Sequence, residues 1–341
     1  NGRVRSLFTL DLGAVRHNVR RLLAILEGAQ LWAVVKADGY GHGAHDVGRA
    51  ALDAGATALC VATVSEALAL REGLPAARII VMGPTSADAI TAAREARLEV
   101  TVAAGAVPEG LPVHVKLDTG MGRWGLAELP APSRDVVGLM SHFASADSDP
   151  VFTERQLERF LEATAPYPGI ARHIANSAGA LAFPAARLDA ARCGIAIYGV
   201  SPFGDGPAAH GLRPALRWDS EVAAAKLLLP GESTGYGRAF VADAPTWIGL
   251  VPVGYADGFR RDMTGTEVLV AGERRRVVGT VSMDVLAVAL DAEPEPGAAV
   301  TLVGDGVLLE EHARVAGTIG YEVACGLNTR APRAQREVVD E

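Results

Sequence analysis

Apolar runs and amphipathic segments alternate along the first two thirds of the chain. Residues 14–27 have the spacing of an amphipathic helix, because Val15, Val19 and Leu22 fall on one face while arginines fall off it. Eight short apolar runs have the length of buried strands. The predicted strands are residues 31–36, 58–63, 78–82, 98–102, 112–117, 136–142, 171–175 and 190–197.

Strands that alternate with helices are typical of a parallel sheet, and eight such strands predict a (β/α)8 barrel, the TIM-barrel fold. A doubly wound open sheet is the alternative, because periodicity does not determine whether a sheet closes. Between several strands lie further predicted helices, at residues 44–54, 65–72, 86–96 and 153–164.

The predicted helix at 153–164 carries a start signal. Thr153 and Gln156 have the spacing of a capping box, and Phe152 is placed to pack against Leu157. Other connections, such as 103–111 and 125–133, leave room only for a turn or a stub of helix.

The pattern changes near residue 213, where short strands separated by glycine and proline replace the alternation. We therefore expect a barrel over residues 1–213 and a mainly β C-terminal domain over 214–341. The opening strand, at about residues 6–12, could pair with the C-terminal domain. The strands predicted in that domain are 218–229, 246–253, 267–271, 275–281, 285–290 and 299–303.

Composition adds limits on partners and compartment. The 341 residues are 49% hydrophobic and carry a net charge of −8 without a long basic run, which argues against nucleic acid or an anionic membrane as partner. No apolar stretch is long enough for a transmembrane helix, and the first residues do not resemble a signal peptide. Cys60, Cys193 and Cys325 are scattered, so we expect no disulfide framework, no metal site and a reducing cytoplasm.

Polar residues follow the predicted strands where the chemistry of a β/α barrel is found, at the carboxyl ends. The stretch "LWAVVKADGYGHG" ends a buried strand with Lys36, although desolvating an ammonium is costly. Taken singly, Lys36 could place its ammonium at the rim, His142 could be a core-edge histidine, and Ser177 and Gly194 could be turn residues. Their occurrence on one rim favours a functional site. The other rim residues are Tyr40, Lys116, Asp118, Arg123, Asn176, Arg192, Ile195 and Tyr198.

The residue types at this rim indicate carbonyl chemistry. A desolvated lysine is a nucleophile towards carbonyls, and Ser177 with the backbone amides near Gly194 could hold a phosphate. A Schiff base between Lys36 and pyridoxal 5'-phosphate (PLP) fits this pair. A class I aldolase, whose lysine attacks a sugar phosphate, fits it equally well.

Seven longer motifs resemble those of the alanine racemases, PLP enzymes that combine a β/α barrel with a C-terminal β domain. The likeness extends from residue 31 to residue 333. The motifs are "AVVKADGYGHG", "KLDTGMGRWG", "SHFASAD", "HIANSAGAL", "RCGIAIYG", "VPVGYADG" and "VGTVSMD".

The resemblance implies a homodimer that interconverts L- and D-alanine at shared sites. Lys36 would carry PLP as an internal aldimine and act as one base, and Tyr255 of the partner subunit would be the other. Two bases suit racemisation, because one proton leaves Cα and another returns on the opposite face. The family's usual role is to supply D-alanine for peptidoglycan precursors.

The resemblance also implies the remaining site residues. Arg192 would face the pyridine nitrogen, and because arginine stays protonated that nitrogen would stay unprotonated. His142 would join Arg192 and Tyr255 in a hydrogen-bond network, and Arg123 would bind the phenolic oxygen and orient the substrate carboxylate. The phosphate would be held by Tyr40, Ser177 and the backbone at Gly194 and Ile195. Met283 of the partner subunit would offer its N–H to the substrate, and Lys116 matches a lysine that is carbamylated in several members.

One motif departs from the family pattern. Where members often have a phosphate-binding tyrosine, "CGLNTRAPR" has Thr329, which has a shorter reach. The alternative to a strict alanine racemase is therefore a broader racemase that also accepts serine. A barrel-type PLP decarboxylase would need an acidic group at the ring nitrogen, which Arg192 argues against. A non-catalytic PLP-handling barrel is disfavoured by the domain that carries Tyr255.

Overall fold

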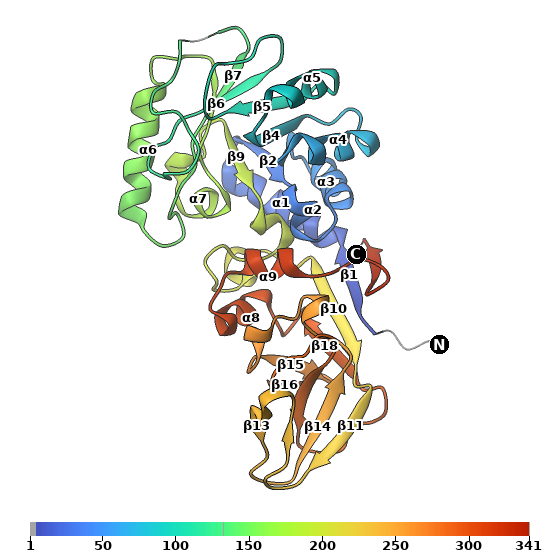
Figure 1. The fold of residues 1–341 in the computed structure, drawn as a ribbon. Coiled ribbons are helices and arrows are strands. Elements are labelled where there is room, and N and C mark those ends of the chain that lie inside the picture. The colour runs from blue at the N-terminus through green and yellow to red at the C-terminus, as the bar shows by residue number, and fades with distance from the viewer. Residues whose placement is uncertain (1–4, 132, 341) are drawn as a thin grey trace. The chain divides into compact units, whose positions relative to one another are not determined.

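The computed structural model describes residues 5–131 and 133–340. The chain forms two compact units (Figure 1). The barrel unit comprises Val15–Phe203 and Ala208–Arg213, and the C-terminal unit comprises Asn1–Ala14, Gly204–Pro207 and Pro214–Glu341. Compactness does not show where a domain folds independently, so the boundary at residue 213 stays a prediction. No helix in the described part of the chain is both long and apolar enough to cross a membrane.

The barrel unit is built on eight parallel strands in the order β8-β7-β6-β5-β4-β3-β2-β9. All eight predicted strands are confirmed, and the sheet curls into a nearly closed barrel rather than the open sheet that was the alternative. Two backbone hydrogen bonds join the region of β8 to that of β9, where the barrel closes. Arg192 N donates to Ala175 O (2.9 Å), and Asp189 N donates to Arg172 O (3.1 Å). The strands are β2 (Gln30–Val34), β3 (Ala58–Val61), β4 (Ile79–Pro84), β5 (Glu99–Val102), β6 (Val113–Lys116), β7 (Val136–Met140), β8 (Ala171–His173) and β9 (Ala190–Cys193).

Helices follow most of these strands on the outside of the barrel, as Figure 1 shows for α3 to α6. The described residues between β5 and β6, and between β6 and β7, contain no helix, as their short length predicted. The helices of this part of the chain are α1 (Leu12–Leu26), α2 (Lys36–Tyr40), α3 (Ala44–Asp53), α4 (Val64–Gly73), α5 (Ala87–Glu95), α6 (Pro150–Thr164) and α7 (Ser177–Ala182).

Helix α6 begins three residues before the predicted start, so the predicted capping box of Thr153 and Gln156 is wrong. Asp149 is the N-cap: its carboxylate accepts from Phe152 N (3.0 Å), and Pro150 occupies the first turn. Gln156 instead donates to the carbonyl of His142 (3.1 Å), which ties α6 to the end of β7.

The C-terminal unit contains a nine-stranded sheet in the order β11-β14-β17-β16-β15-β18-β10-β1-β19. Strand β1 (Leu7–Asp11) pairs antiparallel with β10 and parallel with β19. The predicted strand 218–229 is wrong as one element, because β10 and β11 occupy separate places in the sheet. The strands are β10 (Leu216–Glu221), β11 (Ala224–Leu228), β14 (Thr246–Val251), β15 (Glu267–Val270), β16 (Glu273–Val278), β17 (Leu286–Leu290), β18 (Ala299–Val303) and β19 (Gln335–Val339).

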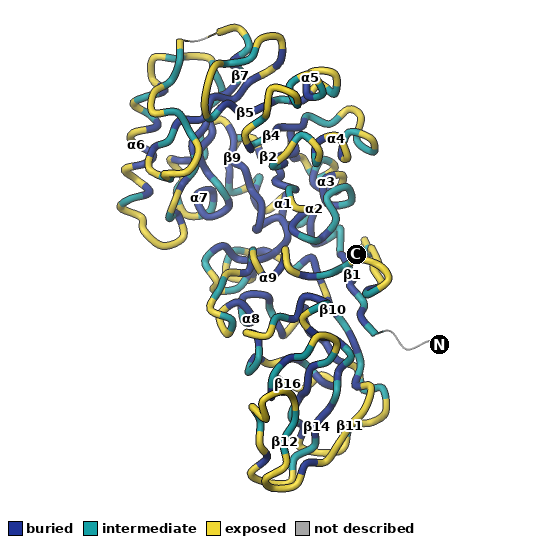
Figure 2. Tube along the Cα trace, viewed as in Figure 1, coloured by how far each residue is buried: buried dark blue, intermediate teal, exposed yellow. Residues whose placement is uncertain are grey.

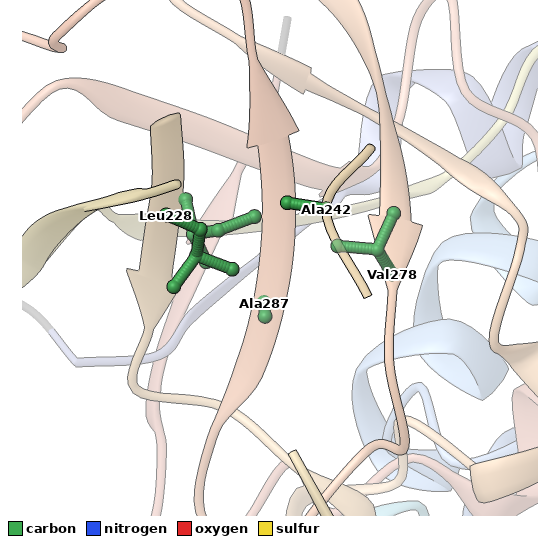
Figure 3. Close-up of a cluster of buried hydrophobic side chains, with 5 residues drawn as sticks. Leu228, Ala242, Val278 and Ala287 are labelled. Carbon is green, nitrogen blue, oxygen red and sulfur yellow. The ribbon is translucent and has the colours of Figure 1, made fainter. Parts of the chain in front are cut away.

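Small apolar side chains form a core on this sheet. Leu228, Ala242, Ile248, Val278 and Ala287 are buried together. Figure 3 shows Leu228, Val278 and Ala287 on strands of the sheet, with Ala242 beside them. Sequence periodicity missed β19, the short hairpin β12 (Ser233–Thr234) and β13 (Phe240–Val241), and the helices α8 (Leu309–Ala316) and α9 (Gly320–Gly326). Within each unit the strands are mostly buried and the outer loops exposed, as Figure 2 shows.

Candidate active site

Lys36 opens a turn of unusual backbone conformation directly after β2. Within α2 (Lys36–Tyr40), Ala37 and Asp38 both have φ of 52°, and Tyr40 has φ of 53°. Left-handed backbone costs about 1–2 kcal/mol per residue that carries a side chain. The turn is supported by Glu66, whose Oε1 accepts from Ala37 N (2.7 Å). Such strain beside a lysine is typical of a functional site.

Arg192, on β9, is a buried cation and is only 2% exposed. Its Nη1 donates to Nδ1 (2.5 Å) and to the carbonyl (3.0 Å) of His173. Its Nη2 donates to the carbonyls of Ser141 (2.7 Å) and Ile174 (3.2 Å) and to Nδ1 of His142 (3.2 Å). No described residue accepts from Nε, so that N–H can serve a ligand. Burial lowers the Arg192 pKa to about 10, so the group stays charged at neutral pH.

His142 follows β7 and lies among cations. Its pKa is held well below the ordinary value, first by burial and then by the charges of Arg192, Lys116, Arg123 and Lys36. The imidazole is therefore neutral at pH 7. Because its Nδ1 accepts from Arg192, its proton is on Nε2.

Lys116 ends β6 and is 5% exposed. Burial, followed by the charges of Arg192 and Arg123, lowers its pKa to about 8. In the part of the chain that the structure describes, no carboxylate pairs with this amine. A buried amine that is partly neutral at pH 7 has the reactivity that carbamylation by carbon dioxide requires.

The loop that carries Arg123 is built around Asp118. The Asp118 carboxylate accepts from the amides of Gly120 (2.9 Å), Met121 (2.8 Å) and Gly122 (3.0 Å). Arg123 is exposed, and its guanidinium carbon lies 5.8 Å from the ring centre of Trp124. The loop therefore presents a cation without enclosing it.

A polar cradle lies at the ends of β2, β8 and β9 and is formed by Tyr40, Ser177 and the backbone at Gly194. The Ser177 hydroxyl accepts from the amides of Gly194 (3.1 Å) and Ala196 (3.4 Å). A side chain at Gly194 would come within 2.5 Å of the Tyr40 hydroxyl, so only glycine leaves this space open. Hydroxyls and backbone amides are donors that suit a phosphate, and with Lys36 and Arg192 this donor set fits PLP.

Tyr255 and Met283 belong to the C-terminal unit and are 42% and 51% exposed. The backbone joins them, since Tyr255 N donates to Ser282 O (3.0 Å) and Ala256 N to Met283 O (3.1 Å). Asp257, buried below them, accepts from Arg5 (2.7 Å) and Arg333 (2.8 Å). The turn that presents Tyr255 is therefore rigidly held.

Tyr236, which none of the sequence motifs singled out, is 73% exposed. It lies between Gly235 (φ 78°) and Gly237 (φ 70°), and its carbonyl accepts from Thr280 Oγ1 (3.0 Å). Tyr236 and Tyr255 thus flank the same segment, residues 279–283. A tyrosine between two glycines in "STGYGR" was the available signal.

Thr329, where the sequence departs from the family pattern, follows Asn328. Asn328 N donates to the carbonyl of Asp257 (3.0 Å), so this segment is held against the turn of Tyr255. The described residues contain no group of three or more His, Cys, Asp or Glu side chains that could hold a metal ion.

The chain matches the models of the alanine racemase N-terminal domain over residues 10–202 and C-terminal domain over residues 215–335. An alanine racemase of Laribacter hongkongensis is 42% identical over 352 residues, covering 95% of this chain and 97% of that protein. The structure of biosynthetic alanine racemase from Pseudomonas aeruginosa is 36% identical with a TM-score of 0.92, covering 99% of this chain and 100% of that one. The Streptomyces coelicolor enzyme is 39% identical with a TM-score of 0.90, covering 99% and 98%. The chain therefore belongs to the alanine racemase family of PLP-dependent isomerases.

Proposed function

We propose that this chain interconverts L- and D-alanine with PLP held on Lys36, and that a tyrosine of the partner subunit completes each site. The observation that carries the proposal is the barrel rim. There a strained turn presents Lys36, Arg192 leaves its Nε–H open, and a hydroxyl and amide cradle suits a phosphate. When bound, PLP withdraws electrons from Cα of the amino acid and makes its proton acidic.

The barrel residues would divide the contacts with the cofactor. Arg192 would donate from Nε to the pyridine nitrogen and, being permanently charged, leave that nitrogen unprotonated. Tyr40, Ser177 and the amides at Gly194 and Ile195 would bind the phosphate.

Lys36 would remove or return the Cα proton on one face of the substrate. Its amine is attached at the end of β2, so the rigid strand and the supported turn determine where Nζ can reach. A second base must act on the opposite face, since a single base would return the proton to the side from which it came.

The second base is proposed to be a tyrosine of the C-terminal unit, contributed by the partner. The resemblance of the motifs to those of the alanine racemases implies Tyr255 of the partner subunit. Tyr236 of the partner subunit is a second candidate, which its greater exposure and its two flanking glycines favour. Both tyrosines are exposed in the chain, as a group that must reach another subunit needs to be. The variants Tyr255→Phe and Tyr236→Phe distinguish them.

Arg123 and the backbone N–H of Met283 of the partner subunit would bind the substrate carboxylate. Carbamylation of Lys116 would turn a cation into an anion beside Arg123 and Arg192 and so hold Arg123 in place. Carbon-13-labelled bicarbonate should give a carbamate NMR signal that is lost in Lys116→Met. A wild-type enzyme without that signal would contradict the modification.

Two further properties follow as proposals. Thr329 has a shorter reach than a tyrosine, so serine is proposed as a weaker second substrate. No disulfide joins Cys60, Cys193 and Cys325, which fits a reducing cytoplasm. The proposed role there is the supply of D-alanine for cell-wall precursors.

The decisive experiment is a racemisation assay of the purified protein loaded with PLP. Incubation with L-alanine should yield D-alanine, which chiral chromatography would detect. Release of carbon dioxide would instead indicate a decarboxylase. A yellow protein that leaves L-alanine unchanged would indicate a PLP-handling protein, and either result would reject the proposal.

A further inference from the structure

Five side chains form a hydrogen-bonded series through the barrel unit. The series begins at Arg192 on β9 and ends at Arg78, just before β4. Arg192 Nη1 lies 2.5 Å from His173 Nδ1, and His173 Nε2 lies 2.8 Å from His114 Nδ1. His114 Nε2 lies 2.8 Å from Glu99 Oε2. Arg78 ends the series, donating to both oxygens of Glu99 at 2.7 and 2.8 Å. The proposed function uses only Arg192 of these five.

With the donor-only Arg192 on one side and the ionised Glu99 on the other, the hydrogen bonds between them all run in one direction. Arg192 has donors alone, so His173 Nδ1 must accept and His173 must carry its proton on Nε2. That proton points at His114 Nδ1, so His114 must carry its own proton on Nε2. The carboxylate of Glu99 accepts the hydrogen bond from His114 Nε2, so each donor of the series has an acceptor. Both imidazoles therefore hold the same tautomer, with a charged donor at one end and a carboxylate at the other.

Glu99 is the only anion among these five hydrogen-bonded side chains. The direct partners of Arg192 are backbone carbonyls and two imidazoles, and the pKa values of His114 and His173 are lowered chiefly by burial. Burial raises the pKa of Glu99, but hydrogen bonds from His114 and Arg78 outweigh it and hold the pKa at about 2. The neighbouring thiols of Cys60 and Cys193 stay protonated, because burial raises their pKa to about 12.

Two neighbours of the imidazoles make this geometry possible. His114 on β6 and His173 on β8 meet across the intervening strand β7 at Gly138, where any side chain would overlap His114 Nδ1. Trp32 packs edge to face against both rings, with centroids 5.5 Å from His114 and 4.5 Å from His173. Packing therefore fixes the orientation of the two imidazole rings and the distance between them. The hydrogen-bond partners then decide which nitrogen of each ring carries the proton.

We propose that Glu99 is a positioning residue for Arg192: it sets the tautomers of His114 and His173, so that a lone pair and not an N–H faces the guanidinium. If the hydrogen bonds ran in the opposite direction, His173 would carry its proton on Nδ1. That N–H would then face the N–H of Arg192 Nη1, and the contact between two donors would displace Arg192. The consequence for catalysis rests on the proposed function, in which the Nε–H of Arg192 contacts the pyridine nitrogen. The tautomers themselves do not depend on it.

The test is the protonation state of the histidine nitrogens in the PLP-loaded enzyme, measured by nitrogen-15 NMR of histidine-labelled protein. The wild type should show Nε2–H for both His114 and His173. In Glu99→Gln, one amide oxygen must serve donors from Arg78 and His114, so a second tautomer should appear at His173. We expect kcat to fall about tenfold, because a hydrogen bond to a charged group is misaligned. The absorption band of lysine-bound PLP should shift, while KM for alanine changes little.

Two matched variants separate this role from general damage. Arg78→Gln keeps the carboxylate and removes its other partner, so the tautomers and kcat should stay within about twofold of the wild type. Gly138→Ala leaves Glu99 in place but forces His114 away from His173, so it should reproduce the loss of kcat. Should Glu99→Gln fail to fold, the wild-type tautomers and Gly138→Ala still decide.

An Nδ1–H at His173 in the wild type would overturn the proposal, as would Glu99→Gln with unchanged tautomers and kcat. A protein that shows the expected tautomers but no band of lysine-bound PLP would contradict the proposed function while leaving the tautomer assignment intact.

Discussion

The site residues of the barrel unit and those of the C-terminal unit differ in how complete their surroundings are. Arg192, Lys116 and Ser177 are buried, and for Arg192 and Lys116 burial has shifted the pKa. Tyr255 and Met283 are exposed. The barrel unit therefore encloses these three proposed site residues within one chain, whereas the C-terminal unit leaves the side chains of Tyr255 and Met283 exposed. The proposed homodimer, in which each subunit covers the other's barrel, would explain both the buried barrel residues and the exposed Tyr255 and Met283.

The largest effect is expected from Lys36→Ala. The variant should lose the absorption band of lysine-bound PLP, and racemisation should fall by at least about 10³-fold, because both the attachment point and one base are removed. Absorbance and a chiral assay measure the two effects, and the melting temperature provides the control for folding. A reducible link between PLP and the Lys36→Ala protein would place the cofactor on another lysine.

The second expected effect tests whether the exposed tyrosines act in the partner's site. Tyr255→Phe and Tyr236→Phe each remove one hydroxyl, and the variant that lacks the second base should lose about 10²–10⁴-fold in kcat. The other variant should lose much less, which identifies the base.

Refolding the inactive tyrosine variant together with Lys36→Ala then tests the dimer. In a mixed dimer one site collects both lesions and the other none, so roughly a quarter of wild-type activity should return with random pairing. If each site were built within one chain, every site would keep one lesion. Mixed dimers that are demonstrably present but inactive would rule out shared sites.

A smaller effect should distinguish the two units in acid. The pKa values of His114, His142 and His173 in the barrel are lowered, and among the described residues of the C-terminal unit only His312 is shifted in this way. Such groups bind protons in the unfolded chain before the folded one, so each lowers the free energy of unfolding by up to about 1.4 kcal/mol per pH unit below about pH 6.5. Lys116 adds little in that range, because it is already protonated in both states.

Amide hydrogen exchange at pH 7 and pH 5 would measure this difference. Peptides from β6 and β8 should lose protection in acid more than peptides from β14 and β17, after correction for the intrinsic exchange rate. Equal losses in the two units would show that the buried histidines do not govern acid stability.

The smallest effect is expected from Thr329→Tyr. A longer side chain with a hydroxyl should slow the loss of PLP on dilution and lower the activity towards serine relative to alanine, each by a few-fold. Thr329→Ser keeps the hydroxyl and serves as control. If both properties stay unchanged, the departure at this position has no effect on the site.

The sequence alone determined the number of barrel strands, the change to a mainly β region and the family, because each depends on local order along the chain. Apolar runs report burial, and motifs such as "AVVKADGYGHG" place particular residues at strand ends. The start of α6 and the division of 218–229 into two strands were wrong for a local reason. Caps and bends depend on which partner a polar group finds. Asp149 caps the amide of Phe152, and Thr153, already inside the helix, donates its hydroxyl to the carbonyl of Asp149.

Only the tertiary structure decided which side chains meet. His114 and His173 are 59 residues apart, and nothing in their spacing predicts that they touch across Gly138 or that Glu99 orients them. The exposure of Tyr236 likewise appears only when its hairpin is placed on the segment 279–283. The physical reason is that periodicity records whether a position is buried, whereas contacts between distant strands are set by the register and closure of the whole sheet.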